Sequence, residues 1–235
     1  MLTQILPLKP IIFGKGQKKQ FLEGHGQFHN WKKHNIFFEL LYWRTLLLCH
    51  NLDVMHVEKK IFDSLIGTIM NIKDKKKDSL STCLDLKEMD IRHTLHPIEV
   101  NGKIELPPAC YSLSNDEKMA ICLWVKNLKF LDGYSANLSR SVNIEERKFF
   151  GMKTHDCHVF LERLLPLAVC DFLPKKVSDA LTKLSNFFKE LCSKVLQVDD
   201  LDRLETQIAI TLYKLEQIFP PSFFDVMVHL AIHLS

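Results

Sequence analysis

The sequence lacks the features that mark several large protein classes. Its 235 residues contain no run approaching the ~18 apolar residues of a membrane span, and no small-residue cleavage site follows the apolar first residues. It also has no glycine-rich phosphate loop, nucleophile elbow or dinucleotide-binding fingerprint. These absences argue against a membrane partner and a secretory signal, and they remove the most recognisable nucleotide-binding and hydrolase motifs.

Paired cysteines and a strong net charge are lacking as well. The seven cysteines are an odd number and form no C-x-x-C pair, so reduced thiols in a cytoplasmic or nuclear protein fit better than a disulfide framework. The net charge of +3, from 31 basic and 28 acidic residues, is too close to balance to indicate nucleic-acid binding by itself. Lysines gather before residue 35 and over 73–77, where we expect solvated loops.

What the sequence does have is a set of helical patterns. Hydrophobic residues make up 46% and charged residues 25%, as in ordinary globular proteins. Apolar residues at spacings of three, four and seven predict a helix over 52–71, with Asn51 as its cap. Two long apolar stripes, over 177–195 and 201–219, predict an antiparallel helical pair.

Local signals predict shorter features. Asn101-Gly102 lies between alternating segments and supplies the positive φ angles of a tight turn, which predicts a β-hairpin over 98–106. A capping box starting at Ser114 opens a further helix, Pro166 should kink or end another, and 132–153 is expected to be a loop. The predicted fold class is therefore mainly α, a helical domain with one short β-hairpin.

Metal-ligand side chains occur in two spaced patterns. Asp53 and His56, with His50 nearby, are three residues apart, so a carboxylate and an imidazole can converge on one point of a helix. The alternative is a helix-start Asp beside an ordinary histidine. His229 and His233 have the i, i+4 spacing of helical zinc ligands, but no Glu follows His229, which argues against an H-E-x-x-H protease.

Two other polar groupings are weaker. In His155-Asp156-Cys157-His158, adjacent helical residues point in different directions, so we expect a capping Asp and surface histidines. Two-metal phosphoryl chemistry requires carboxylates that converge, and the pattern does not indicate convergence for the acidic residues that follow residue 57. These acidic residues are Glu58, Asp63, Asp85, Glu88 and Asp90.

Long ordered motifs resemble the transposase of plant En/Spm-type (CACTA) DNA transposons over about residues 12–235. They are LDVMHVEKKIFDSLIGTIMNI, LPPACYSLSNDEK, GYSANLSRSVN, MKTHDCHVFLERLLPLAV and IFPPSFFDVMVHLAIHL. The sequence departs from the family at Leu41, where proline is common, and at Lys60, where asparagine is common.

The resemblance also implies a domain organisation. Residues 1–35 would be a mobile basic leader, and 36–110 would be the C-terminal end of the transposase domain. Residues 111–139 would form a connecting helix and loop. Residues 140–235 would be the truncated start of a helical domain of unknown function, DUF4218. The helical part is expected to resemble the insertion region of a ribonuclease-H-like transposase.

Related cut-and-paste transposases carry a C/D-x-x-H motif and a later histidine pair. The resemblance therefore implies a structural zinc centre formed by Asp53, His56, His229 and His233, although Asp53 could instead orient His56. In the intact family, three other acidic residues hold two Mg²⁺ ions for phosphodiester chemistry. Transposon-end DNA would be the partner and the nucleus the location; without the resemblance, the location would be cytoplasmic.

The expected function is that of a remnant. The chain starts after the segment that should carry the early catalytic aspartates, and it ends before the acidic residue expected beyond His233. We therefore expect a transposon-derived fragment without catalysis that retains a structural zinc site and weak DNA binding. The alternative is a non-catalytic helical interaction module whose C-terminal helices bind a protein partner.

Overall fold

The structure, a computed structural model, describes Gln27 and residues 52–130 and 137–234. The chain divides into two compact units, Met1–Asn51 and Leu52–Ser235, and the described helices and strands belong to the second. The predicted basic leader, except Gln27, lies outside the described residues, and so do His50 and Asn51.

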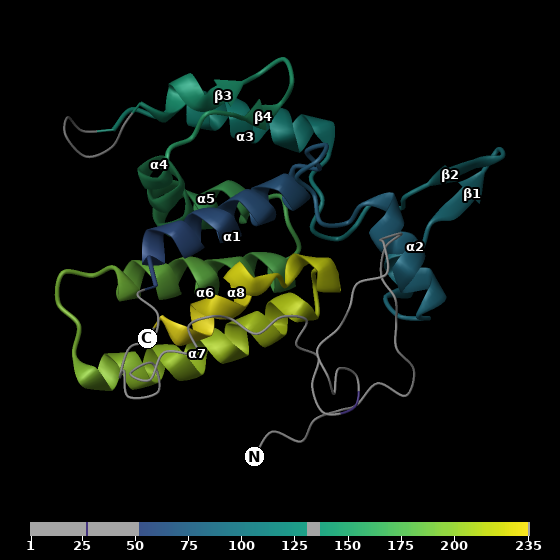
Figure 1. The fold of residues 1–235 in the computed structure, drawn as a ribbon. Helices are drawn as coiled ribbons and strands as arrows, with labels where there is room; N and C mark the ends of the chain where they lie inside the picture. Colours follow the sequence, from purple (N-terminus) through teal and green to yellow (C-terminus); the bar gives the residue numbers. More distant parts are fainter. Residues whose placement is uncertain (1–26, 28–51, 131–136, 235) are drawn as a thin grey trace. The chain divides into compact units, whose positions relative to one another are not determined.

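The unit Leu52–Ser235 is built mainly from helices (Figure 1), which confirms the predicted class. The α-helices are α1 (Val54–Ile69), α2 (Leu80–Glu88), α3 (Asn115–Asn127), α4 (Thr154–Val159), α5 (Leu165–Val169), α6 (Lys175–Leu191), α7 (Val198–Glu216) and α8 (Val226–Leu230). The strands are β1 (Ile98–Val100), β2 (Lys103–Glu105), β3 (Val142–Asn143) and β4 (Lys148–Phe149). The other turns are the 3₁₀ segments η3 (His93–Leu95), η4 (Leu138–Ser141), η6 (Pro221–Phe223) and η7 (Ala231–His233), and the π-helical η5 (Phe160–Leu164).

Helix α1 forms much as its apolar spacing predicts, and it contributes to the centre of the core. Its N-cap is Asp53 and not the predicted Asn51, and the Asp53 carboxylate accepts a hydrogen bond from the backbone N–H of His56 at 3.1 Å. Ile61 and Leu65 are at most 1% exposed, and the helix packs against both α4 and α8. Segments far apart in the sequence therefore share one core.

Helices α6 and α7 form the predicted pair (Figure 1). The inward stripes are fully buried at positions such as Leu184 and Leu204, because each amphipathic helix covers the apolar face of the other. Arg203 of α7 donates to the carboxylate of Glu190 of α6 at 2.8 Å on the exposed side of the pair.

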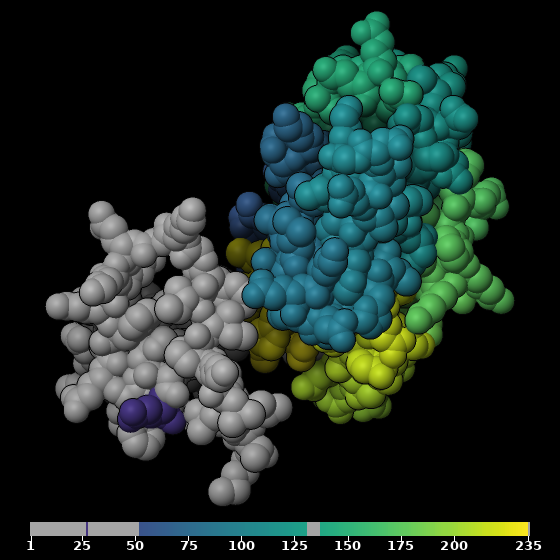
Figure 2. All heavy atoms as spheres, turned by 90° about the vertical axis from the view of Figure 1, so that its right-hand side faces the viewer, coloured from purple at the N-terminus to yellow at the C-terminus, as the bar shows by residue number. Residues whose placement is uncertain are grey.

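The predicted hairpin is present as β1 and β2, which pair antiparallel from Ile98 opposite Glu105. Asn101 and Gly102 turn the chain with φ angles of 52° and 73°, a conformation that these two residue types adopt at low cost. Every residue of both strands is exposed, and this teal part of the chain faces the viewer in Figure 2.

A second strand pair, β3 and β4, is a correction to the sequence prediction, which expected only a loop over 132–153. Val142 lies opposite Phe149, and both are buried against α3 and the rest of the core. Two-residue strands have too little alternation to be recognised from sequence, because the period of two needs at least about four residues to show.

Pro166 affects the helix before it rather than simply ending it. The chain runs from α4 through one π-helical segment, η5, into α5, with the N–H of Leu165 bonded to the carbonyl of Phe160. A proline cannot donate to the preceding turn, and a π-turn is one way to accommodate that missing bond. None of the described helices combines the length and the apolar character that a bilayer crossing requires.

Candidate functional site: a buried Glu–His cluster

The first predicted pair, Asp53 and His56, lies at the start of α1. Both residues are exposed, and the Asp53 carboxylate already accepts the capping hydrogen bond from the His56 backbone. The structure thus matches the simpler alternative, in which an aspartate caps a helix next to an ordinary histidine.

The second predicted pair, His229 and His233, does come together. The two Nε2 atoms are 3.4 Å apart on the exposed side of the C-terminal helical turns. That separation is close to the ~3.3 Å between neighbouring ligands of a tetrahedral zinc ion with bonds of about 2 Å. Asp53 and His56 do not complete this pair, because the described residues form only one group of three or more potential ligands, and it is a different one. The structure therefore does not bring the four predicted residues to one centre, and zinc binding at the His229–His233 pair stays a prediction.

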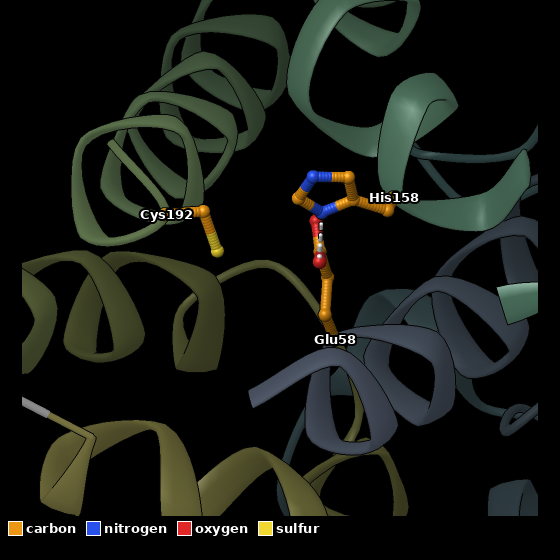
Figure 3. Close-up of side chains that lie close together, drawn as sticks. All are labelled: Glu58, His158 and Cys192. Atoms are coloured by element: carbon orange, nitrogen blue, oxygen red, sulfur yellow. Dashed lines mark hydrogen bonds and ion pairs between the residues drawn. The ribbon is translucent and has the colours of Figure 1, made fainter. Parts of the chain in front are cut away.

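That group consists of Glu58, His158 and Cys192 (Figure 3), whose ligand atoms all lie within 4.8 Å of one another. Glu58 comes from α1 and has no exposed surface. Its Oε2 atom lies 2.6 Å from Nδ1 of His158 on α4, a short hydrogen bond between side chains one hundred residues apart. Cys192 is the residue that ends α6.

Glu162 extends the cluster from the π-helical segment. Its Oε1 atom is 3.6 Å from Nδ1 of His158, and the residue is 8% exposed. The same carboxylate interacts with the Cys192 thiol. The π-turn thus belongs to the local structure that places a second carboxylate at the site, as such turns often do at functional positions.

Burial dominates the electrostatics of the cluster, and neighbouring groups modify its effect. Burial raises the pKa of Glu58 to about 7, the nearby Glu162 adds to this rise, and the contact with His158 opposes it. Partial burial raises the pKa of the Cys192 thiol to about 12 although the residue is exposed, and the charges of Glu58 and Glu162 add to this rise. Glu58 and Cys192 therefore resist carrying their negative charges.

Two buried oxygens at the cluster have no hydrogen-bond partner in the protein. They are Oε1 of Glu58 and Oε1 of Glu162. An unpartnered buried acceptor costs free energy comparable to the loss of a hydrogen bond, and such groups are rare in folded proteins. The arrangement is therefore suited to holding a proton or a cation between the carboxylates.

The residues of the grouping His155-Asp156-Cys157-His158 have different environments in the structure. The carboxylate of Asp156 accepts from the Lys153 N–H at 2.9 Å, as expected for a capping aspartate. Cys157 is buried in the core. The expectation of surface histidines was wrong for His158, because it turns inward to Glu58 and its side chain is 18% exposed.

Glu58 is distinguished in the sequence by its position on the apolar face of a helix. It lies four residues before Phe62 and seven before Leu65, hence on the apolar face of α1. A carboxylate on a core stripe needs a buried partner, so Glu58 stands apart from the other acidic residues. The identity of that partner was not visible, because His158 lies in a segment whose approach depends on the tertiary fold.

Residues 191–235 match the family described as Domain of unknown function (DUF4218). The matched segment begins at the last residue of α6 and includes Cys192, α7 and α8, whereas Glu58 and His158 precede it. No curated protein and no solved structure matches the chain.

Proposed function

We propose that this chain is part of a cut-and-paste DNA transposase of the plant CACTA (En/Spm) type, and that its helical unit has a structural rather than a catalytic role. The carrying observation is the DUF4218 match at 191–235, which follows segments whose motifs resemble that transposase. The packing supports the proposal, because α1 from the transposase-like part contacts α8 from the matched part. The proposed partner is DNA and the proposed location is the nucleus.

The positions of the carboxylates support a role without catalysis. Two-metal phosphoryl transfer needs acidic side chains that hold two ions about 4 Å apart. Glu58 instead pairs with His158, and Asp225 forms an ion pair with Lys77 at 3.0 Å while it caps α8. Within 52–130 and 137–234, no three carboxylates form a candidate metal group. In the intact family enzyme, Mg²⁺ would be held by other acidic residues.

The lysine-rich turn after α1 is the proposed source of weak DNA affinity. Lys73 and Lys75 are exposed, whereas Lys77 is engaged by Asp225. Contacts to phosphates release counterions, so affinity that rests on two lysines should fall with salt by a shallow slope.

Two assays on the purified full chain test this proposal. Incubation with supercoiled plasmid and Mg²⁺ or Mn²⁺ should give no nicked product. Fluorescence anisotropy with a labelled DNA duplex should show weak binding that weakens as salt rises. Lys73→Glu with Lys75→Glu should reduce binding, and Lys194→Glu, at an exposed lysine between α6 and α7, serves as control. Nicking that EDTA abolishes would overturn the non-catalytic role, and undetectable binding at low salt would overturn the DNA-binding role.

A helical protein-interaction module is the second candidate, and one surface feature favours it. A cavity of about 310 Å³ lies between α7 and the C-terminal turns, lined by Leu212, Tyr213, Phe224 and Ile232 among others. Tyr213 is 61% exposed beside it, which is typical of aromatic residues at protein interfaces. This candidate expects no DNA affinity at any salt concentration.

A further inference from the structure

We propose that Glu58, His158, Glu162 and Cys192 form a binding site for a transition-metal ion, and that Zn²⁺ is the ion their chemistry fits best. The proposal uses no family resemblance and is independent of the proposed function. It also differs from the predicted centre at Asp53, His56, His229 and His233, because it shares no residue with it.

The geometry brings three potential ligands within reach of one ion and places a fourth, Glu162, beside the imidazole. Glu58, His158 and Cys192 offer an oxygen, a nitrogen and a sulfur within 4.8 Å of one another, and Glu162 places an oxygen 3.6 Å from the same imidazole nitrogen. Neighbouring ligands of tetrahedral zinc lie about 3.3 Å apart. The 2.6 Å contact between His158 and Glu58 must therefore open by roughly 0.7 Å when the ion enters.

The unpartnered oxygens are an independent sign of a missing ligand. Glu58 is wholly buried, and its Oε1 atom has no partner although its Oε2 atom is bound by His158. Oε1 of Glu162, which lies 3.6 Å from the same Nδ1 atom of His158, also has no hydrogen-bond partner. A bound cation would satisfy both oxygens at once, whereas a single proton could satisfy only one of them.

The donor set selects the class of ion. One imidazole, one thiolate and two carboxylates are ligands that Zn²⁺ accepts in four-coordinate sites. Mg²⁺ and Ca²⁺ prefer six or more oxygens and do not take sulfur, so the cluster is unsuited to them. Cys192 is the exposed member of the group, and the ion would enter from its side.

Charge explains why the ion would be held. A thiolate and two carboxylates that lie this close together repel one another, and the burial of Glu58 keeps water from screening the repulsion. A dication offsets this repulsion, so binding should release protons and should tie α1, η5 and the end of α6 together.

The test uses the full chain after removal of metal by a chelator. Co²⁺ binds to zinc sites and its absorption spectrum depends on the ligands. Titration with Co²⁺ should therefore produce the sulfur-to-cobalt charge-transfer absorption of a bound thiolate. Addition of Zn²⁺ should displace Co²⁺ and remove this absorption. Cys192→Ser should abolish that absorption and weaken Zn²⁺ binding by at least about tenfold. Cys170→Ser, at an exposed cysteine outside the cluster, is the matched control and should change neither.

Further variants keep the outcome decisive. Glu162→Gln should weaken Zn²⁺ binding even if Cys192→Ser fails to fold, and the double variant His229→Ala with His233→Ala should retain the absorption. Wild-type protein that shows no thiolate absorption with Co²⁺ would overturn the proposal. So would absorption that survives Cys192→Ser, or that disappears when the His229 and His233 pair is removed.

Discussion

At the scale of single residues, Glu58 is the most deeply buried carboxylate among the described residues. A carboxylate with no exposed surface on an apolar helix face is tolerated because His158 bonds to it from α4. The sequence shows that Glu58 occupies a core position, since its spacing from Phe62 and Leu65 can be read directly. The sequence does not show which residue pairs with Glu58. The partner is one hundred positions away, and local patterns do not predict contacts between segments so far apart.

The raised pKa of Glu58 predicts an unusual dependence of stability on pH. The folded protein holds this proton up to a pH of about 7, whereas the unfolded chain releases it near the ordinary value of 4.5. The folded state therefore binds more protons between these values, and the stabilising contribution of Glu58 is full below pH 4.5 and is lost as the pH rises through about 7.

Urea unfolding of chelator-treated protein measures this effect. The unfolding free energy of wild type relative to Glu58→Gln should fall by at most about 3 kcal/mol between about pH 4.5 and about pH 7.5. Glu105→Gln removes one exposed carboxylate and controls for the change in net charge. A difference that stays constant over this range would show that Glu58 titrates as it does in the unfolded chain.

At the scale of elements, recognition from sequence depended on the length of the pattern. The predicted helices α6 and α7 were confirmed, because their apolar spacing repeats over several turns. The capping box of α3 was confirmed too, because two residues at a fixed spacing mark it. The β3–β4 pair was missed because it is two residues long on each side. Pro166 was expected to disturb its helix, but the π-turn that it accompanies depends on how the helix packs and could not be specified.

The capping box of α3 should contribute measurably to stability. The Ser114 hydroxyl accepts from the Glu117 N–H at 3.3 Å, and the Glu117 carboxylate accepts from the Ser114 N–H at 2.7 Å. Ser114→Ala should lower the unfolding free energy by about 1 kcal/mol in urea titration. Thr206→Ala, at an exposed position of α7, should change it by less than about 0.5 kcal/mol. Equal effects of the two substitutions would contradict a specific role for the cap.

Truncation of a buried side chain in α6 should lower the unfolding free energy more than loss of the cap. Leu184 of α6 is fully buried, so Leu184→Ala removes methyl groups from a packed core and should cost about 2–5 kcal/mol in unfolding free energy. Leu167→Ala in α5 is the control, because it removes the same atoms from a side chain that is 63% exposed. It should lower the unfolding free energy much less. Similar losses at both positions, measured by chemical denaturation, would mean that α6 and α7 do not pack as described.

At the scale of the described unit, elements from distant parts of the sequence share one core. Helix α1 lies in the part predicted to end a transposase domain, and α8 lies in the part that matches DUF4218, yet the two helices contact each other. The predicted domain boundaries near 110 and 140 stay predictions. Patterns along the chain locate segments, but they do not show which segments pack together into one domain. The Glu58–His158–Glu162–Cys192 cluster draws on both parts, since Cys192 belongs to the matched segment.

The central claim is that this cluster holds a metal ion, and the zinc content of the folded chain tests it most directly. The protein would be loaded with Zn²⁺, freed of loosely bound metal by gel filtration, and analysed for zinc per chain. The double variant His229→Ala with His233→Ala should retain one zinc ion per chain, and the same variant carrying Cys192→Ser in addition should retain almost none. Retention of one zinc ion in both proteins, or of none in the first, would contradict the claim.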